Sequence, residues 1–166
     1  AGAKGYTAGM LQHRPAQFAV HADVNHPLYD KAKGATKWDE VGEVLYNRGL
    51  VNAMLGVEAI RTAQKKFGNK PLTGEQVRWG IENLDLNGER IKALGFDGML
   101  QPLKVSCSDH EGTRAGRIQQ WDGAKWTIIS DWYQSDDKVI KPMVDAAAKK
   151  YADEKKLAVR DCSKES

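Results

Sequence analysis

The sequence predicts an α/β fold, and three observations along the chain predict it. Apolar residues recur at helical spacing through residues 40–66. Two strand-like runs flank the dipeptide Asp122-Gly123, which is typical of a β-hairpin. A second amphipathic pattern covers residues 139–155. The expected order is a strand, a group of helices, a second strand, a hairpin and a last helix.

The N-terminal third is expected to hold one strand and two helices. Residues 5–11 read as a short strand, which ends before Pro15 because proline cannot donate to a ladder. Asp23 or Asn25 is expected to cap a short helix over residues 27–34. The long helix follows and ends near Gly68. Its two internal glycines, at 49 and 56, cost about 1 kcal/mol each relative to alanine, so we expect a neighbour packed closely there.

Two short helices and then β structure are expected next. Thr73 and Gln76 form a capping box, and Asn87 is expected to cap a helix that ends at Gly95. Residues 102–107 read as a strand and residues 108–112 as a turn. The hairpin strands are expected at residues 117–121 and 125–130. Pro142 should lie in the first turn of the last helix, because proline breaks a helix interior.

Composition excludes several classes of function. The chain has 166 residues with 25 Lys+Arg against 22 Asp+Glu, a net charge of +3 spread along its length, so nothing indicates a nucleic-acid partner. A mean hydropathy of −0.58 and the lack of an apolar run near 18 residues exclude a membrane span. Because the sequence opens without an initiator Met or a signal peptide, we expect a processed chain or a fragment.

The cysteines and nearby polar residues suggest two kinds of chemistry. Ser106, Ser108, Asp109 and His110 hold the groups of a hydrolase, but no Gly-x-Ser-x-Gly elbow is present, so a simple turn is favoured. Cys107 with Asp109, His110 and Cys162 could form a zinc site, but the paired Cys-x-x-Cys pattern is missing. We favour a disulfide over zinc, although composition leaves both free thiols and a bridge closing about 55 residues open.

Other motifs carry less weight. His13, His21 and His26 lack the helical spacing of a metal site and read as ordinary histidines. The tryptophans at 121, 126 and 132 could line a pocket, but cross-strand pairing is favoured. The sequence has no phosphate-binding loop and no dinucleotide fingerprint, so no cofactor is expected. From these residues alone we expect an α/β domain that is not an enzyme.

Four runs of the chain resemble a known family. They cover residues 39–64 (DEVGEVLYNRGLVNAMLGVEAIRTAQ), 72–84 (LTGEQVRWGIENL), 102–112 (PLKVSCSDHEG) and 120–126 (QWDGAKW). Together they resemble the C-terminal half of branched-chain amino-acid/urea-type substrate-binding proteins of ABC transporters, which are the Leu/Ile/Val-binding, type I periplasmic receptors. The runs occur in the family's order and span nearly the whole chain.

The resemblance implies a partial type I periplasmic-binding-protein fold, with helices around a mostly parallel sheet plus a C-terminal hairpin and helix. Residues 1–13 would be a late strand of the second lobe, residues 14–113 would complete part of the first lobe, and residues 114–166 would return to the second lobe. The whole chain would be a fragment. Gly112 and Gly116 would suit a hinge, and export would favour a disulfide between Cys107 and Cys162.

The resemblance also implies a function. The chain would be the C-terminal portion of a periplasmic solute-binding component, delivering a small carboxylated solute such as an amino acid, amide or aromatic acid to an inner-membrane permease. No catalytic residue and no cofactor are implied. Tyr46, Arg48, Asp109 and His110 are the residues we expect to face the ligand cleft, the first two because a helix N-terminus favours a carboxylate. The alternatives are a small hydrolase or zinc protein using Cys107, Asp109 and His110, or a module that forms a homodimer.

Overall fold

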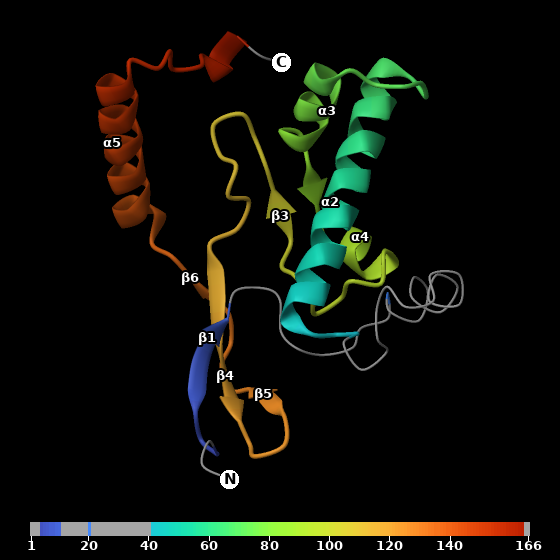
Figure 1. The fold of residues 1–166 in the computed structure, drawn as a ribbon, viewed down its shortest axis with the longest axis vertical. Helices are drawn as coiled ribbons and strands as arrows, with labels where there is room; N and C mark the ends of the chain where they lie inside the picture. Colours follow the sequence, from blue (N-terminus) through green and yellow to red (C-terminus); the bar gives the residue numbers. More distant parts are fainter. Residues whose placement is uncertain (1–3, 11–19, 21–40, 165–166) are drawn as a thin grey trace.

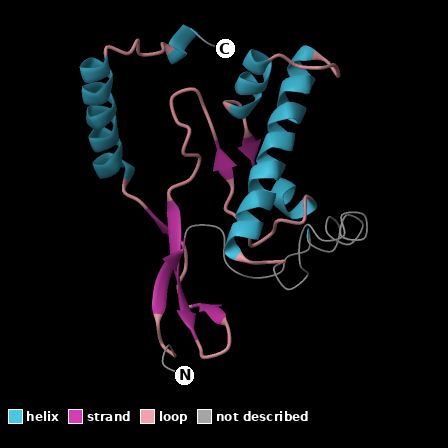
Figure 2. Ribbon diagram, in the orientation of Figure 1, coloured by secondary structure: helices cyan, strands magenta, loops and turns pink. Residues whose placement is uncertain are grey.

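The computed structural model describes residues 4–10, 20 and 41–164. The helix expected over residues 27–34 and the three N-terminal histidines lie outside these residues. In chain order the described elements are β1 (Thr7–Met10), α2 (Val44–Phe67), α3 (Gly74–Ile81), β2 (Asp85–Leu86), α4 (Gly88–Ala93), β3 (Leu103–Lys104), β4 (Ala115–Trp121), β5 (Trp126–Ile128), β6 (Tyr133–Gln134), α5 (Asp137–Lys155) and the 3₁₀ turn η2 (Cys162–Lys164). The expected mixture of helices and sheet is confirmed (Figures 1 and 2).

The hydrophobic core lies in what we call the helical part, formed by α2, α3, α4, β2 and β3 (Figure 1). The helix predicted from the apolar periodicity of residues 40–66 is confirmed, but its buried face is not the predicted one. Val51 and Met54 supply the core. The periodicity placed Leu45, Val57 and Ile60 on the apolar face, whereas in the structure these three are exposed. The remaining core residues are Val20, Leu86, Ile91, Phe96, Met99, Leu100 and Leu103. The buried carboxylate of Glu58 on α2 accepts two hydrogen bonds of 2.8 Å from Arg90 on α4, which joins the two helices.

The short helices begin where the capping residues predict. The Thr73 hydroxyl accepts a hydrogen bond from the Gln76 N–H, and the Gln76 side chain accepts one from the Thr73 N–H, so the capping box is complete. The Asn87 side chain accepts from the Arg90 N–H at 2.8 Å and starts α4. Both helices were predictable because these contacts lie within three residues.

The close approach between α2 and α3 occurs at a glycine that the sequence analysis did not single out. A Cβ built on Gly80 would lie 2.2 Å from the Ala59 carbonyl oxygen, so only glycine fits there. The close neighbour expected at Gly49 and Gly56 is not found among the described residues, since beyond the adjacent residues and the surrounding helix backbone no described atom lies within 4 Å of a Cβ at either position. Both glycines lie on the exposed side of α2.

What we call the sheet part consists of β1, β4, β5 and β6. The strand order is β1-β4-β5, and β6 pairs with the other end of β4. The expected mostly parallel sheet is not found among the described strands, because every described pair, including β2 with β3, is antiparallel. A parallel pair needs a crossover of a dozen or more residues between its strands. Among the described strands, only β4 and β5 are joined by a tight hairpin, which forces an antiparallel pair. In contrast, β2 and β3 are separated by a segment that contains α4, so their direction is set by tertiary packing and not by connection length. The strand expected at 102–107 is paired in a ladder only at Leu103 and Lys104.

The hairpin between β4 and β5 is confirmed. Asp122 organises its turn, because one carboxylate oxygen accepts from the N–H groups of Ala124 and Lys125 at 2.8 and 2.9 Å. These bonds, that of Lys125 foremost, hold the pKa of the Asp122 carboxyl below its usual value. Gly123 adopts a φ of +107°, which explains the glycine after the aspartate.

The last helix, α5, begins earlier than expected. Asp136 caps it by accepting a hydrogen bond from the Lys138 N–H, so Asp137 is the first helical residue and Pro142 lies beyond the first turn. The expectation for Pro142 is therefore wrong, since the Asp136 cap starts the helix five residues before the proline. No side chain of α5 is buried by the described residues, although it carries an apolar face. Among the described residues, no helix combines the length and the apolar character that crossing a membrane requires.

Candidate functional site

Residues 105–114 connect the helical part to the sheet part, and they contain most of the polar residues that the sequence analysis singled out (Figure 1). After β3 the chain forms a tight turn in which Ser106 and Asp109 exchange backbone hydrogen bonds of 2.9 and 3.2 Å. The Ser106 hydroxyl also accepts from the Asp109 N–H at 3.1 Å. The turn expected at residues 108–112 thus begins earlier, at Ser106, whose backbone and hydroxyl hold it. Asp109 also accepts from the Glu111 N–H, as expected for a turn there.

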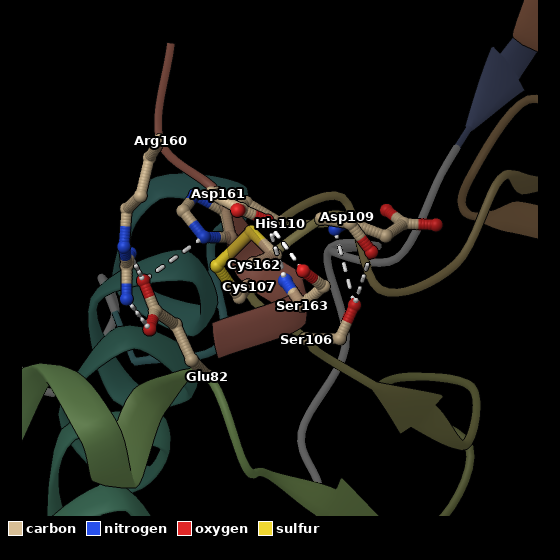
Figure 3. The surroundings of a disulfide bond; sticks show 10 residues. Glu82, Ser106, Cys107, Asp109, His110, Arg160, Asp161, Cys162 and Ser163 are labelled. Atoms are coloured by element: carbon tan, nitrogen blue, oxygen red, sulfur yellow. Dashed lines mark hydrogen bonds and ion pairs between the residues drawn. A yellow bond between two sulfur atoms is a disulfide. The ribbon is translucent and has the colours of Figure 1, made fainter. Parts of the chain in front are cut away.

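Cys107 in this turn is bonded to Cys162 in η2, 55 residues later, with their Cα atoms 5.7 Å apart (Figure 3). The disulfide pairing is confirmed. It overturns the zinc alternative, since a disulfide sulfur is not a thiolate ligand. Within the described residues, no group of three or more His, Cys, Asp or Glu side chains could hold a metal ion.

A buried carboxylate lies beside the disulfide. Glu82, at the C-terminal end of α3, has a side chain only 6% exposed, and Arg160 donates to both of its oxygens, with one distance of 2.8 Å. His110 Nε2 lies 3.3 Å from the same carboxylate. Figure 3 shows both side chains turned toward Glu82. The Arg160 hydrogen bond holds the pKa of Glu82 below its usual value even though burial opposes ionisation.

A second ionic cluster is centred on Arg114. Its guanidinium donates to Asp109 at 2.9 Å and to Glu111, and it lies 3.5 Å from Asp137 in the first turn of α5. Partial burial opposes ionisation of Asp109, but the Glu111 N–H and Arg114 hold its pKa below the usual value. Arg114 therefore ties the connecting segment to the start of α5. The sequence carried no signal for this cluster, because its members are up to 28 residues apart and have no fixed spacing.

An open pocket of about 390 Å³ lies where the two parts meet. It is bounded by β2 and β3 on one side and by residues 112–114, β6 and the start of α5 on the other. The lining residues are Asp85, Leu86, Asn87, Pro102, Leu103, Lys104, Gly112, Thr113, Arg114, Gln134 and Asp137. The Lys104 ammonium, 3.3 Å from Asp85, and the Arg114 guanidinium place two cations on its wall. Asp85 and Asp137 line the same wall and already pair with these cations, so a carboxylate would bind here only in exchange for them.

The four residues expected at a ligand cleft fall into two groups. Asp109 and His110 lie in the turn beside the disulfide, and Asp109 reaches the wall of the pocket through Arg114. Tyr46 and Arg48 lie at the start of α2, whereas α3 packs on Ala59, roughly 20 Å further along the helix at 1.5 Å per residue. Tyr46 is partly buried, which raises the pKa of its phenol, and Arg48 is exposed. None of the four lines the pocket, so their ligand-facing role stays a prediction.

The chain was compared with protein families, curated sequences and solved structures, and only the solved structures gave matches. No protein-family model and no curated protein sequence matches the chain. Among solved structures, the chain is similar to a protein described as an ABC transporter permease from the Pseudomonas fluorescens group. The two are 46% identical with a TM-score of 0.85, over 96% of this chain and 39% of that one. The chain spans well under half of that protein.

A second solved structure has the same fold at lower identity. It is a branched chain amino acid ABC transporter from Thermus thermophilus with bound valine. It is 22% identical with a TM-score of 0.60, over 82% of this chain and 36% of that one. Both structures that this chain resembles are thus of ABC-transporter-related proteins, and the chain corresponds to a part of each.

Proposed function

We propose that this chain is part of the solute-binding component of an ABC importer, acting in the periplasm and without catalytic activity. The observation that carries the proposal is the 46% identity and TM-score of 0.85 over 96% of the chain to an ABC-transporter protein. The Thermus protein of the same fold binds valine, a small carboxylated solute. We therefore propose an amino acid, amide or aromatic acid as the solute, and an inner-membrane permease as the partner.

The pocket between the two parts supports this proposal. Its walls come from elements on both sides of the connecting segment at residues 105–114, so a rotation of one part against the other would change its shape. Gly112, in that wall, adopts a φ of +76°, a conformation that glycine reaches without strain. The pocket is open to a solute, whose carboxylate would bind Lys104 and Arg114 in exchange for Asp85 and Asp137 on the same wall.

The test is solute-dependent stabilisation. In a fused protein, this chain would replace the matching part of the Pseudomonas protein, and the rest of that protein would be kept. The melting temperature of the fused protein would then be measured with branched-chain amino acids, amides and aromatic acids. A solute at 100 times its Kd should stabilise the fused protein by about 2.7 kcal/mol. The 166-residue chain alone should respond far less. Tight 1:1 binding by the chain alone would contradict an incomplete site, and no response of the fused protein to any solute would contradict the receptor role.

A matched pair of variants locates the binding site. Lys104→Gln in the fused protein should weaken binding of a carboxylated solute several-fold, because it removes a cation from the pocket wall. Lys125→Gln, in the exposed hairpin turn, should leave binding unchanged. Equal effects of the two variants would show that the solute does not bind in this pocket.

The second candidate is a permease subunit, which the description of the Pseudomonas protein favours. Fractionation of cells that express the chain separates the two candidates. A solute-binding component should be released with the periplasmic contents, and a permease subunit should need detergent.

A further inference from the structure

The helix α5 carries a continuous apolar stripe that nothing in the described structure covers. Ile140, Val144, Ala147 and Tyr151 recur at the spacing that places residues on one helical face, and we call these four the α5 stripe. Val144 is 44% exposed and Tyr151 57% exposed. Met143 borders the stripe and is also exposed. At 1.5 Å per residue the stripe is about 16 Å long.

A helix with this surface needs a packing partner. Most helical stability in proteins comes from packing of an amphipathic face, and α5 has no buried side chain among the described residues. It also contains Pro142, which has no N–H to offer the Lys138 carbonyl and so destabilises the helix interior. A contiguous exposed apolar surface of this kind marks an interaction site.

The stripe is held in a defined position. At the start of α5, Asp137 lies 3.5 Å from Arg114. After its end, Arg160 binds Glu82 at the end of α3 and Cys162 is bonded to Cys107, so the chain is fixed to the connecting segment before the helix, and to that segment and α3 after it. Figure 1 shows α5 standing apart from α2, α3 and α4. A surface that is already ordered loses little conformational entropy on binding.

The comparison with the Pseudomonas protein indicates what covers the stripe. The match extends over 96% of this chain, and because the unmatched remainder is shorter than α5, the match includes at least part of this helix. The same match accounts for only 39% of the Pseudomonas protein. In that protein a longer stretch of polypeptide is therefore available to pack on the corresponding helix. We propose that the α5 stripe is the docking surface for the part of such a longer protein that this chain does not match. The proposal depends on fold and length and not on the proposed solute-binding function.

The test compares the chain alone with the fused protein described above. Hydrogen exchange of the α5 amides, residues 137–155, should be at least tenfold slower in the fused protein. Val144→Glu, in the stripe, should lower the folding equilibrium constant of the fused protein at least tenfold and that of the chain alone less than twofold. Lys149→Glu is the matched control, because it introduces the same side chain on the opposite, polar face; there it loses an exposed pair with Asp153 and places a carboxylate four residues from Asp145 and Asp153. These effects are local to α5, so the substitution should have the same small effect in both proteins.

Three results would overturn the proposal. The first is equally fast exchange of α5 in both proteins, and the second is an equal effect of the two substitutions in the fused protein. The third is a dimer of the chain alone, detected by light scattering, that Val144→Glu dissociates, since the stripe would then pair two copies. If the fused protein does not fold, glutamate substitutions at the two aligned positions of the crystallised Pseudomonas protein provide the same comparison. None of these measurements uses a solute, so they succeed or fail independently of the receptor role.

Discussion

Arg160 and Glu82, which are 78 residues apart in sequence, form a bidentate ion pair beside the disulfide. The Glu82 side chain is 6% exposed and Arg160 is 29% exposed. The carboxylate is therefore nearly dehydrated, and Arg160 is the group that compensates for its burial. This pair and the disulfide together attach the segment after α5 to the helical part of the molecule.

Removal of the arginine should destabilise the protein strongly. Arg160→Ala should lower the free energy of unfolding by about 2 to 3 kcal/mol, since it leaves a buried carboxylate without its main charge partner. Lys150→Ala is the control, because its pair with Glu154 is exposed on both sides and contributes about 0.5 kcal/mol at most. Urea unfolding measures both. A loss for Arg160→Ala no larger than that for Lys150→Ala would contradict the structural role of the buried pair.

Stability should fall in acid. Glu58, Glu82 and Asp109 each have a folded pKa below the usual value, the first two chiefly through hydrogen bonds from arginine. A depressed folded pKa contributes stability that is fully present above the unfolded pKa, which is 4.5 for Glu, and is lost as the pH falls through the folded value. The urea midpoint should be flat from pH 7 to about 5.5 and should drop below about pH 4.5.

The Glu82→Gln variant provides the control for this pH dependence. It should show a shallower fall in stability between about pH 4.5 and 3 than the unsubstituted protein, because one of the depressed carboxyls is gone. An unchanged pH profile would mean that Glu82 does not contribute to acid sensitivity.

Loss of the disulfide should lower stability without unfolding the helical part. A bridge closing a 55-residue separation contributes about 4 kcal/mol in the chain-entropy model, and neither the turn at Cys107 nor η2 contributes a residue to the hydrophobic core. Cys107→Ser/Cys162→Ser should therefore reduce the free energy of unfolding by up to about 4 kcal/mol, measured in urea. Thiol titration of the unfolded, unreduced protein should find no free thiol. Two free thiols would contradict the pairing.

The glycine at the crossing of α2 and α3 should not tolerate a methyl group. Gly80→Ala would place its Cβ 2.2 Å from a carbonyl oxygen, so the helices must move apart, at a cost of about 2 kcal/mol or more. Gly56→Ala has open space in the described structure and lies in a helix interior, so it should stabilise by about 0.5 to 1 kcal/mol. Thermal melts of the two variants should move in opposite directions. A shift in the same direction for both would contradict the packing at Gly80.

Elements whose stabilising contacts lie within a few residues were predictable from the sequence. The Thr73 and Asn87 caps and the Asp122 turn are closed by hydrogen bonds over two or three residues, so their residue types and spacing are sufficient to identify them. The long helix was predictable because one apolar face recurs over many turns. The cysteine pairing was expected, but only the resemblance to exported receptors favoured it over free thiols.

Tertiary structure alone decided the features that join distant segments. No local pattern marks Glu82 as the partner of Arg160, or Arg114 as the centre of three acidic residues, because any exposed arginine could have met a different carboxylate. Because local sequence does not reveal contacts between distant segments, it also did not single out the glycine at the helix crossing. Glycines at 49 and 56 and at 80 look alike in sequence, and only the approach of α3 makes Gly80 the essential one.

The mixture of helices and strands was determined by periodicity and turn residues alone. These features report how each segment folds locally. Which strands pair, in which direction, and which helix face stays exposed depend on contacts between segments far apart in the chain. For that reason, the antiparallel pairing of the described strands and the uncovered face of α5 became evident only from the structure.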